Sequence, residues 1–290
     1  MLTFPKYLSI QTTSLCNASC VFCPYKDIKD VRFKTIMDRG LYEKVINECS
    51  NHKDIECIIV YMNNEPLTDP CIVERINYAK DKVPWASVHI LTNGALLSDD
   101  LADKLIDSRL DWIGVSFHGI RKETIERAMG IPYEISLKRI TNFIEKAKAK
   151  KNIKNYFMLT FLRHVYLTPQ EREEAISFWR KLGIERISYF DGPISRASNV
   201  TNLPKVYHQG KISGCNSIWA DEMLHVVEDG KVILCCMDWR REVILGDLNK
   251  QSIHEIWNGK RRKIWDMIRG TGEVPEGFLC RRCEEAKQEI

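Results

Sequence analysis

Three cysteines near the start of the chain, Cys16, Cys20 and Cys23, are spaced to bind one iron–sulfur cluster. Three thiolates on one loop can cap three irons of a 4Fe-4S cubane and leave the fourth iron without a protein ligand. That open iron could bind the amino and carboxylate groups of a methionine moiety and pass an electron to its sulfonium. Cleavage of a C–S bond would then release a carbon radical that takes hydrogen from a substrate.

Structural zinc and three unrelated buried thiols are the alternatives for this triplet. Zinc sites usually combine one C-x2-C pair with a second pair, and no fourth ligand lies nearby in the sequence. Phe22, directly before Cys23, adds an apolar group beside the site. The triplet therefore favours an oxygen-sensitive cluster.

A second cysteine group lies in the last third of the chain, where a hairpin and a returning tail could gather four thiolates. They are Cys215, Cys235, Cys280 and Cys283, with Gly230 before the second of them. Either a second 4Fe-4S cluster or a structural zinc ion would satisfy these ligands. The first cluster makes iron the preferred metal.

The remaining cysteines have simpler roles. Cys236 follows Cys235, and neighbours on a strand point to opposite faces, so both are not expected to bind one cluster. Cys236 fits a core residue or a hydrogen donor near the site. Cys49, Cys57 and Cys71 are expected to be buried small hydrophobic residues.

Composition indicates a globular protein from a reducing compartment. With 290 residues, 44% of them hydrophobic, the chain can form one large catalytic domain or a domain with an appendage. The net charge is +4 and the basic run 260–263 fits a solvated helix face, so no nucleic-acid partner is expected. Without a signal peptide or an apolar span, we expect a cytoplasmic protein with no membrane partner, whose cysteines serve metal or redox chemistry.

Short β-branched or aromatic runs alternate with amphipathic stretches from residue 7 to about 192. This alternation is typical of βα units around a parallel sheet. Strands are expected near 7–12, 57–61, 87–91, 112–117, 156–161 and 186–190, and helices near 39–50, 70–81, 98–108, 133–150 and 169–182. Six units instead of eight predict a partial barrel that is open on one side.

Polar residues follow the predicted strand ends, where βα folds usually carry their functional groups. The cysteine triplet follows the first strand, and the next three strands lead into Asn63-Asn64-Glu65-Pro66, Thr92-Asn93-Gly94 and Ser116-Phe117-His118-Gly119. The informative residues are therefore expected at one face of the sheet.

A second unit begins near residue 210, after the alternation weakens. Apolar runs at 222–227 and 231–235 flank Asp229-Gly230, a strong hairpin signal, and a helix is expected at 252–267. We divide the chain into a partial barrel at 1–200 and a small α+β iron–sulfur domain at 201–290.

The C-x3-C-x2-C spacing, with an aromatic residue before the last cysteine, resembles the radical S-adenosylmethionine (SAM) superfamily. The resemblance implies an α/β fold with a partial (β/α)6 TIM barrel, a 4Fe-4S cluster and SAM. Asn63, Asn64 and Glu65 are similar to the superfamily's Gly-Gly-Glu loop at the cofactor amino group, and asparagine tolerates the positive φ of such a turn. Ser116 matches the position that binds the cofactor ribose, and Asn93 lies on the neighbouring loop; ordinary turn chemistry would also account for both.

An arginine often precedes a glycine in the superfamily's helix after the fourth strand, where it faces the cofactor carboxylate. This chain has Met129-Gly130 at that place. Arg127 and Arg163 are therefore the candidates for this contact.

The second cysteine set, with Gly230, resembles the Twitch form of the SPASM domain, which carries one auxiliary 4Fe-4S cluster. A fully ligated cluster cannot chelate substrate, but it can accept an electron from a substrate radical. Loss of hydrogen, a proton and that electron would turn an alcohol into a ketone. The resemblance thus implies an oxidoreductase acting on a small polar substrate such as a sugar or aminocyclitol, as 2-deoxy-scyllo-inosamine dehydrogenase does, with a reducing partner such as flavodoxin or ferredoxin.

The stretch from Ile194 to Ser198 resembles a segment of that enzyme type with a substrate-facing arginine. Arg196 is therefore expected to orient the substrate as an electrostatic stabiliser, because a guanidinium stays charged. Asp191, His118 and Asp238 are the candidate proton acceptors, and a loop-capping role would also account for each.

Peptide modification is the competing function, through a thioether, a C–C crosslink or an epimer. Many such relatives carry an N-terminal leader-binding domain, which is not expected here because the cluster motif begins at residue 16. A separate leader-binding protein or direct peptide recognition stays open. A third class is an activating or maturase enzyme that installs a glycyl radical.

Overall fold

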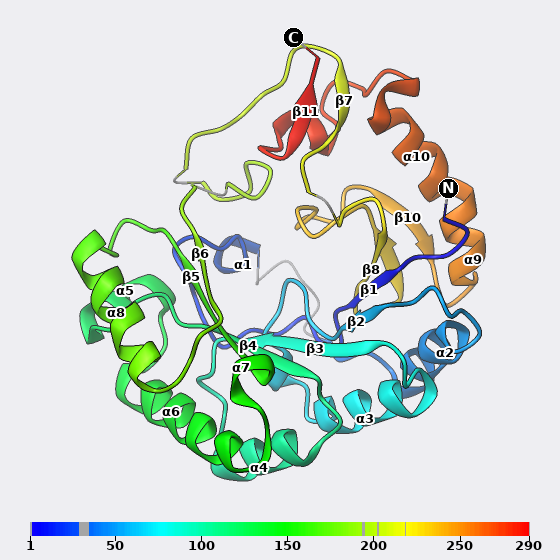
Figure 1. Ribbon diagram of the computed structural model, residues 1–290. Coiled ribbons are helices and arrows are strands. Elements are labelled where there is room, and N and C mark those ends of the chain that lie inside the picture. Colours follow the sequence, from blue (N-terminus) through cyan, green and yellow to red (C-terminus); the bar gives the residue numbers. More distant parts are fainter. Residues whose placement is uncertain (1, 29–34, 193–194, 202, 218, 290) are drawn as a thin grey trace.

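A computed structural model describes residues 2–28, 35–192, 195–201, 203–217 and 219–289. Its centre is a curved sheet in which six strands pair in parallel in sequence order (Figure 1). These strands are β1 (Tyr7–Ile10), β2 (Cys57–Ile59), β3 (Ser87–Thr92), β4 (Trp112–Ser116), β5 (Phe157–Leu162) and β6 (Ile187–Phe190). The six predicted strands are confirmed, with ends shifted by one or two residues.

Helices lie along the outer side of the sheet (Figure 1). Those predicted are α2 (Arg39–Cys49), α3 (Ile72–Lys82), α4 (Asp99–Asp107), α6 (Tyr133–Lys150) and α8 (Pro169–Lys181). Local signals explain two of their starts, because the Ser98 and Thr168 hydroxyls accept hydrogen bonds from backbone N–H groups of the first turns of α4 and α8. Three short helices were not predicted: α1 (Tyr25–Ile28), α5 (Lys122–Met129) and α7 (Ile153–Tyr156).

The core lies between the sheet and these helices. Phe117, Phe157 and Phe161 are fully buried, as are Phe143 of α6 and Trp179 of α8. The rings of Phe117 and Trp179 meet edge to face, with centroids 6.0 Å apart. This packing fixes the strand ends that carry the polar loops.

The sheet continues beyond β1 into the C-terminal part of the chain. The predicted hairpin is confirmed as β8 (Met223–Val226) and β9 (Lys231–Ile233), followed by β10 (Ile244–Asp247). Because β8 pairs in parallel with β1, the sheet has nine strands in the order β10-β9-β8-β1-β2-β3-β4-β5-β6. The hairpin was expected in a separate unit, yet it shares a sheet with the barrel.

A second, two-stranded sheet of β7 (Ile212–Cys215) and β11 (Ala286–Gln288) lies near the C-terminus (Figure 1). The helix predicted at 252–267 is a bent segment of α9 (Ile253–Ile256), η2 (Trp257–Arg261), α10 (Arg262–Asp266) and η3 (Met267–Thr271). Gly259 has non-helical backbone angles and introduces the bend. None of the helices in the described ranges is long and apolar enough to cross a membrane.

The basic run 260–263 is not uniformly solvated as predicted. Arg261 is buried, its guanidinium lies 3.4 Å from the Trp257 ring centroid, and it donates to the Asp221 carbonyl at 2.6 Å. Burial lowers its pKa to about 9. A stacking cation therefore secures the bent helix to the turn before β8.

Candidate active site

The cysteine triplet lies on the loop after β1, and the end of α5 holds this loop in place. The backbone N–H groups of Ser19 and Val21 donate to the carbonyls of Met129 and Ala128, each at 2.9 Å. Gly130 follows with φ 65°, and a Cβ there would lie 2.1 Å from Ser19 Oγ. The Met129-Gly130 pair, noted in the sequence for its missing arginine, thus positions the cluster loop.

Burial sets the chemistry of the triplet. It raises the pKa of Cys16 to about 12 and that of Cys20 well above its ordinary value, and negative charge on Cys23 raises both further. Buried thiols with such pKa values ionise only beside strong positive charge, which iron provides. The Tyr25 hydroxyl also accepts from the Cys16 N–H at 2.9 Å. The loop therefore fits the cluster that its spacing predicts.

Glu65 lies at the end of the loop after β2, at the start of η1 (Pro66–Thr68), and is 2% exposed. Its carboxylate accepts from the N–H groups of Leu67 (3.1 Å) and Asn93 (2.7 Å) and from the Thr92 hydroxyl (2.6 Å). Burial outweighs these bonds and raises the pKa of Glu65 to about 7. Glu65 therefore joins two strand-end loops beside the triplet.

Asn63 and Asn64, in the loop after β2, do not have the positive φ values that the sequence suggested. Neither Asn63 nor Asn64 has a positive φ, so the left-handed tolerance of asparagine is not what the turn uses. The Asn63 N–H donates to Gln11 Oε1 at 3.1 Å, and its side chain donates to the Cys236 carbonyl at 3.2 Å. Asn64 Oδ1 accepts from Met62 N–H, while its buried Nδ2 has no partner within the described residues.

Asn93 and Ser116 flank the same face. Asn93 donates from its side chain to Asn17 Oδ1 at 2.8 Å and accepts from Ala95 N–H at 2.9 Å, which fits turn chemistry. Ser116 is half-buried at the end of β4. Asn64 has an unpartnered Nδ2 and Ser116 is partly exposed, and the contact of either residue with a cofactor stays a prediction.

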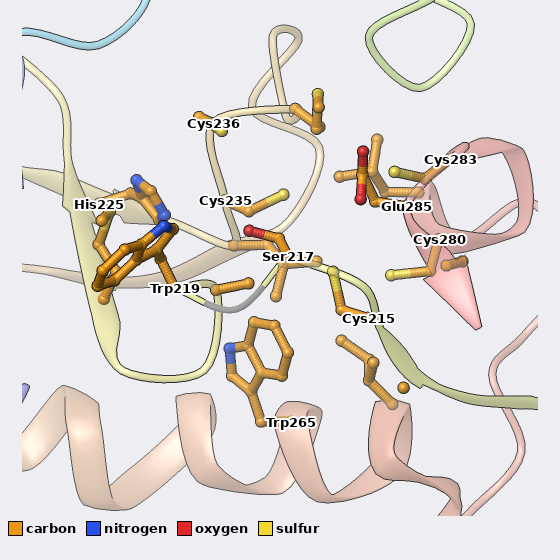
Figure 2. A pocket seen from close by; sticks show the side chains of 18 residues that line it. Cys215, Ser217, Trp219, His225, Cys235, Cys236, Trp265, Cys280, Cys283 and Glu285 are labelled. Atoms are coloured by element: carbon orange, nitrogen blue, oxygen red, sulfur yellow. The ribbon is translucent and has the colours of Figure 1, made fainter. Parts of the chain in front are cut away.

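The predicted auxiliary cysteines surround one cavity of about 160 Å³. Figure 2 shows the sulfurs of Cys215, Cys235, Cys280 and Cys283 turned toward a common space, with Cys236 apart from them. The ligands come from β7, from the turn after β9 and from η4 (Leu279–Arg282) with the residue after it. The hairpin and the returning tail therefore gather the four thiols as predicted.

The thiols around this cavity, like those of the first group, are half-buried or buried and would ionise only beside a metal. Burial raises the pKa of Cys280 and Cys283 to about 12, and charge on Cys215 raises both. Among the described residues, no three His, Cys, Asp or Glu side chains are placed to hold a metal ion. An iron–sulfur cluster differs from one ion because it needs a cavity between its ligands, and these thiols have one.

The other cysteines divide by burial. Cys49 and Cys57 are buried, as predicted, and Cys57 Sγ lies 3.2 Å from His89 Nδ1. Cys71 is exposed, so its prediction as a buried residue is wrong. Cys71 directly precedes α3, and the amphipathic pattern of the helix does not show that this residue lies outside it.

The two cysteine groups belong to parts of the chain that touch. Trp239, in the loop after Cys235, forms a buried cluster with Tyr25 and Ile28, and Cys16 and Cys23 pack against this cluster. The Asn63 bond to the Cys236 carbonyl makes a second connection. The auxiliary part of the chain therefore packs against the loop of the first cysteine group.

Arg196 is half-buried between these two parts. Burial dominates the pKa of both His118 in the barrel and Cys236 in the auxiliary part, and the Arg196 guanidinium acts on both by lowering these pKa values. Ile194, at the start of the stretch that suggested Arg196, lies outside the described residues. Arg196 is therefore near groups of both parts, and its role toward substrate stays a prediction.

His118 is poorly suited to accept a proton. It is buried, its Nδ1 accepts from the Leu162 N–H at 3.0 Å, and burial lowers its pKa to about 3. A catalytic base needs a pKa near the working pH. Asp238 caps a turn by accepting from the N–H groups of Glu242 and Val243. These two residues serve local structure.

Asp191 lies in a larger cavity of about 780 Å³ beside the cluster loop. Phe22 also lines this cavity, with Arg163, which pairs with Asp191 at 3.5 Å. Arg127 is engaged over the ring of Tyr166, 4.3 Å from the centroid. Sequence patterns had not indicated this cavity, because the loop after β5 that lines it carries no motif.

Family models match both parts of the chain. The model of the radical SAM superfamily matches residues 10–178, more than half of the chain, and that of SPASM, an iron-sulfur cluster-binding domain, matches residues 207–284.

Curated relatives are distant. The tungsten-containing aldehyde ferredoxin oxidoreductase cofactor-modifying protein of Pyrococcus furiosus is 22% identical over 292 residues, 90% of this chain and 80% of that protein. The S-adenosyl-L-methionine-dependent 2-deoxy-scyllo-inosamine dehydrogenase of Niallia circulans is 19% identical over 95% of this chain and 91% of that protein. An uncharacterized protein of Methanocaldococcus jannaschii is 26% identical over 60% of this chain, and the match spans about half (52%) of that relative's length.

Solved structures share the fold. The crystal structure of BtrN in complex with AdoMet and 2-DOIA has a TM-score of 0.62 at 17% identity, over 93% of this chain and 89% of that chain. Streptococcus suis SuiB bound to precursor peptide SuiA has a TM-score of 0.71 at 12% identity, over 98% and 70%. The chain therefore belongs to the radical SAM superfamily, with a C-terminal SPASM domain, and its cofactors are a 4Fe-4S cluster, SAM and an auxiliary iron–sulfur cluster.

Proposed function

We propose that this radical SAM enzyme is a dehydrogenase that oxidises a hydroxyl-bearing carbon of a small polar substrate, such as a sugar or aminocyclitol. The observation that carries the proposal is the set of four thiols around one cavity, Cys215, Cys235, Cys280 and Cys283. A cluster held by all four would have no iron free for substrate, which suits an electron acceptor. The proposed boundary near residue 200 separates this domain from the barrel.

When bound, the first cluster and SAM would supply a radical that removes hydrogen from substrate, and the auxiliary cluster would supply an acceptor for the second electron. Loss of hydrogen, a hydroxyl proton and that electron leaves a ketone. In this proposal Cys16, Cys20 and Cys23 hold the first cluster, and a flavodoxin or ferredoxin supplies the reducing electron. The similarity to the Niallia circulans dehydrogenase along 95% of this chain supports this chemistry.

Two side chains would act on the substrate hydroxyl. The Arg196 guanidinium would stabilise the negative charge that develops on oxygen. Asp191, in the larger cavity beside Arg163, is the proposed proton acceptor. Asn63, Asn64, Glu65, Asn93 and Ser116 form the proposed SAM site.

Peptide modification is the second candidate. Its support is the likeness to SuiB, which was solved with a precursor peptide and has the higher TM-score of the two structures compared. A glycyl-radical activating role has no comparable support among these observations.

Product analysis separates the candidates. Anaerobically reconstituted enzyme is given SAM, a reductant and a panel of sugars and aminocyclitols carrying deuterium at hydroxyl-bearing carbons. We expect at least one substrate to yield a ketone and deuterated 5′-deoxyadenosine. The Cys20→Ala variant should cleave no SAM, and Cys71→Ala, an exposed cysteine outside both sites, should behave as wild type. Turnover only with peptides would refute the dehydrogenase and favour the second candidate.

A further inference from the structure

The turn that carries Arg196 has an unusual backbone. Arg196, Ala197 and Ser198 are consecutive and have φ values of 56°, 53° and 60°. L-residues other than glycine rarely adopt this left-handed region, and usually do so singly. Among the described residues, Arg241 is the only other non-glycine residue with a positive φ. Such strain persists only where the surroundings impose it.

Glu284 accepts hydrogen bonds from three donors of this turn. Its Oε1 accepts from the Arg196 N–H at 2.9 Å, and its Oε2 accepts from the Ala197 N–H at 3.1 Å and the Ser195 hydroxyl at 3.0 Å. Successive N–H groups in such a turn form a concave site for an anion. One carboxylate therefore satisfies three donors of the strained turn.

Further bonds tie the turn to the segments that carry the auxiliary cysteines. Arg282 Nε donates to the Ala197 carbonyl at 3.1 Å, and the Arg282 carbonyl accepts from the Ser198 hydroxyl at 3.2 Å. Asn199 Nδ2 donates to the Met237 carbonyl at 3.3 Å. These partners lie within two residues of Cys235 or Cys283.

We propose that Glu284 is a positioning residue that holds the turn at 195–198, so that binding of the auxiliary cluster through Cys283 fixes Arg196 at the substrate site. This inference rests on the proposed role of Arg196 toward substrate. The auxiliary cluster then has a structural effect on the substrate site in addition to accepting an electron. Without the cluster, the terminal segment loses its anchor and the turn relaxes.

Hydrogen exchange of the reconstituted holoenzyme tests this directly. In Glu284→Ala we expect the Arg196 and Ala197 amides to exchange about tenfold faster than in wild type, because each loses its acceptor. Iron content and SAM affinity should stay unchanged. Glu276→Ala, an exposed glutamate of the same terminal region, should leave the exchange as it is. Cys280→Ser/Cys283→Ser, which removes two cluster ligands, should accelerate exchange at 195–199.

Two results would overturn the inference. One is exchange of the Arg196 and Ala197 amides at the wild-type rate in Glu284→Ala with full iron content. The other is full protection of residues 195–199 in Cys280→Ser/Cys283→Ser. If Glu284→Ala loses auxiliary iron, Glu284→Gln decides, because it keeps the side-chain volume and one acceptor oxygen. Faster exchange of the Arg196 and Ala197 amides in Glu284→Gln with full iron content supports the positioning role of Glu284. Exchange at the wild-type rate, or loss of iron in Glu284→Gln as well, refutes that role. No substrate is present in these measurements, so failure of alcohol oxidation would leave their result unaffected.

Discussion

Glu65 shows how one buried carboxylate can organise a cofactor site. Three donors from its own loop and from β3 with the loop after it surround its two oxygens. These bonds favour the ionised form, burial favours the neutral form, and burial wins, with a pKa of about 7. The hydrogen bonds by which Glu65 connects the two loops should therefore depend on pH near neutrality.

The contribution of Glu65 to the stability of the protein should fall as pH rises toward 7. The pKa of Glu65 is 4.5 ordinarily and about 7 when folded. Between these values the unfolded chain releases the proton that the folded protein keeps, so each pH unit costs up to about 1.4 kcal/mol. Denaturant unfolding from pH 5.5 to 7.5 should show this loss as a difference in slope between wild type and Glu65→Gln, because buried neutral histidines such as His118 act in the opposite direction in both proteins. The exposed Glu276→Gln should keep the wild-type slope, and equal slopes in all three proteins would contradict the account.

At the residue scale, the spacing of residues in the sequence predicted the metal ligands, but it did not predict which way other side chains point. The cysteine sets could be found because thiols have few other uses in such clusters. The roles of His118 and Asn63 could not, because they depend on partners that are distant in sequence, Leu162 of β5 and Gln11 directly after β1. Glu284 had no sequence signal, because the turn that it holds becomes visible only as positive φ values.

At the scale of elements, a buried polar chain joins the barrel to the hairpin. Glu228, after β8, accepts from Gln11 Nε2 at 2.8 Å and from Arg241 at 2.7 Å on both oxygens. Gln11 also accepts from Asn63 in the loop after β2. The helices and strands could be predicted from local periodicity, but the pairing of β8 with β1 that creates this contact could not.

Removing the charge of Glu228 should destabilise this junction. Glu228→Gln leaves Arg241 without its buried partner and should cost about 3 kcal/mol. Asp229→Asn, which removes the partly exposed neighbour 3.7 Å from the same arginine, should cost less than about 1 kcal/mol. Anaerobic denaturant unfolding measures both. Equal midpoints for the two variants would show that the buried chain does not support the junction.

At the scale of the molecule, two cysteine sites are built against one another on one continuous sheet. The hairpin that leads to Cys235 extends the barrel sheet, and Trp239 beyond it packs beside the first cysteine loop. The C-terminal tail brings Cys280 and Cys283 back to the same cavity. The Arg196 guanidinium is near both His118 of the barrel and Cys236 of the auxiliary part, which supports its proposed role toward a substrate.

Iron stoichiometry of matched variants tests this arrangement most directly. After anaerobic reconstitution, wild type should hold about eight irons per chain, and Cys16→Ala/Cys20→Ala/Cys23→Ala and Cys280→Ala/Cys283→Ala should each hold about four. The second variant should still cleave SAM. A wild type with about four irons and bound zinc, or a Cys280→Ala/Cys283→Ala variant that keeps about eight, would contradict the assignment of one cluster to each cysteine group.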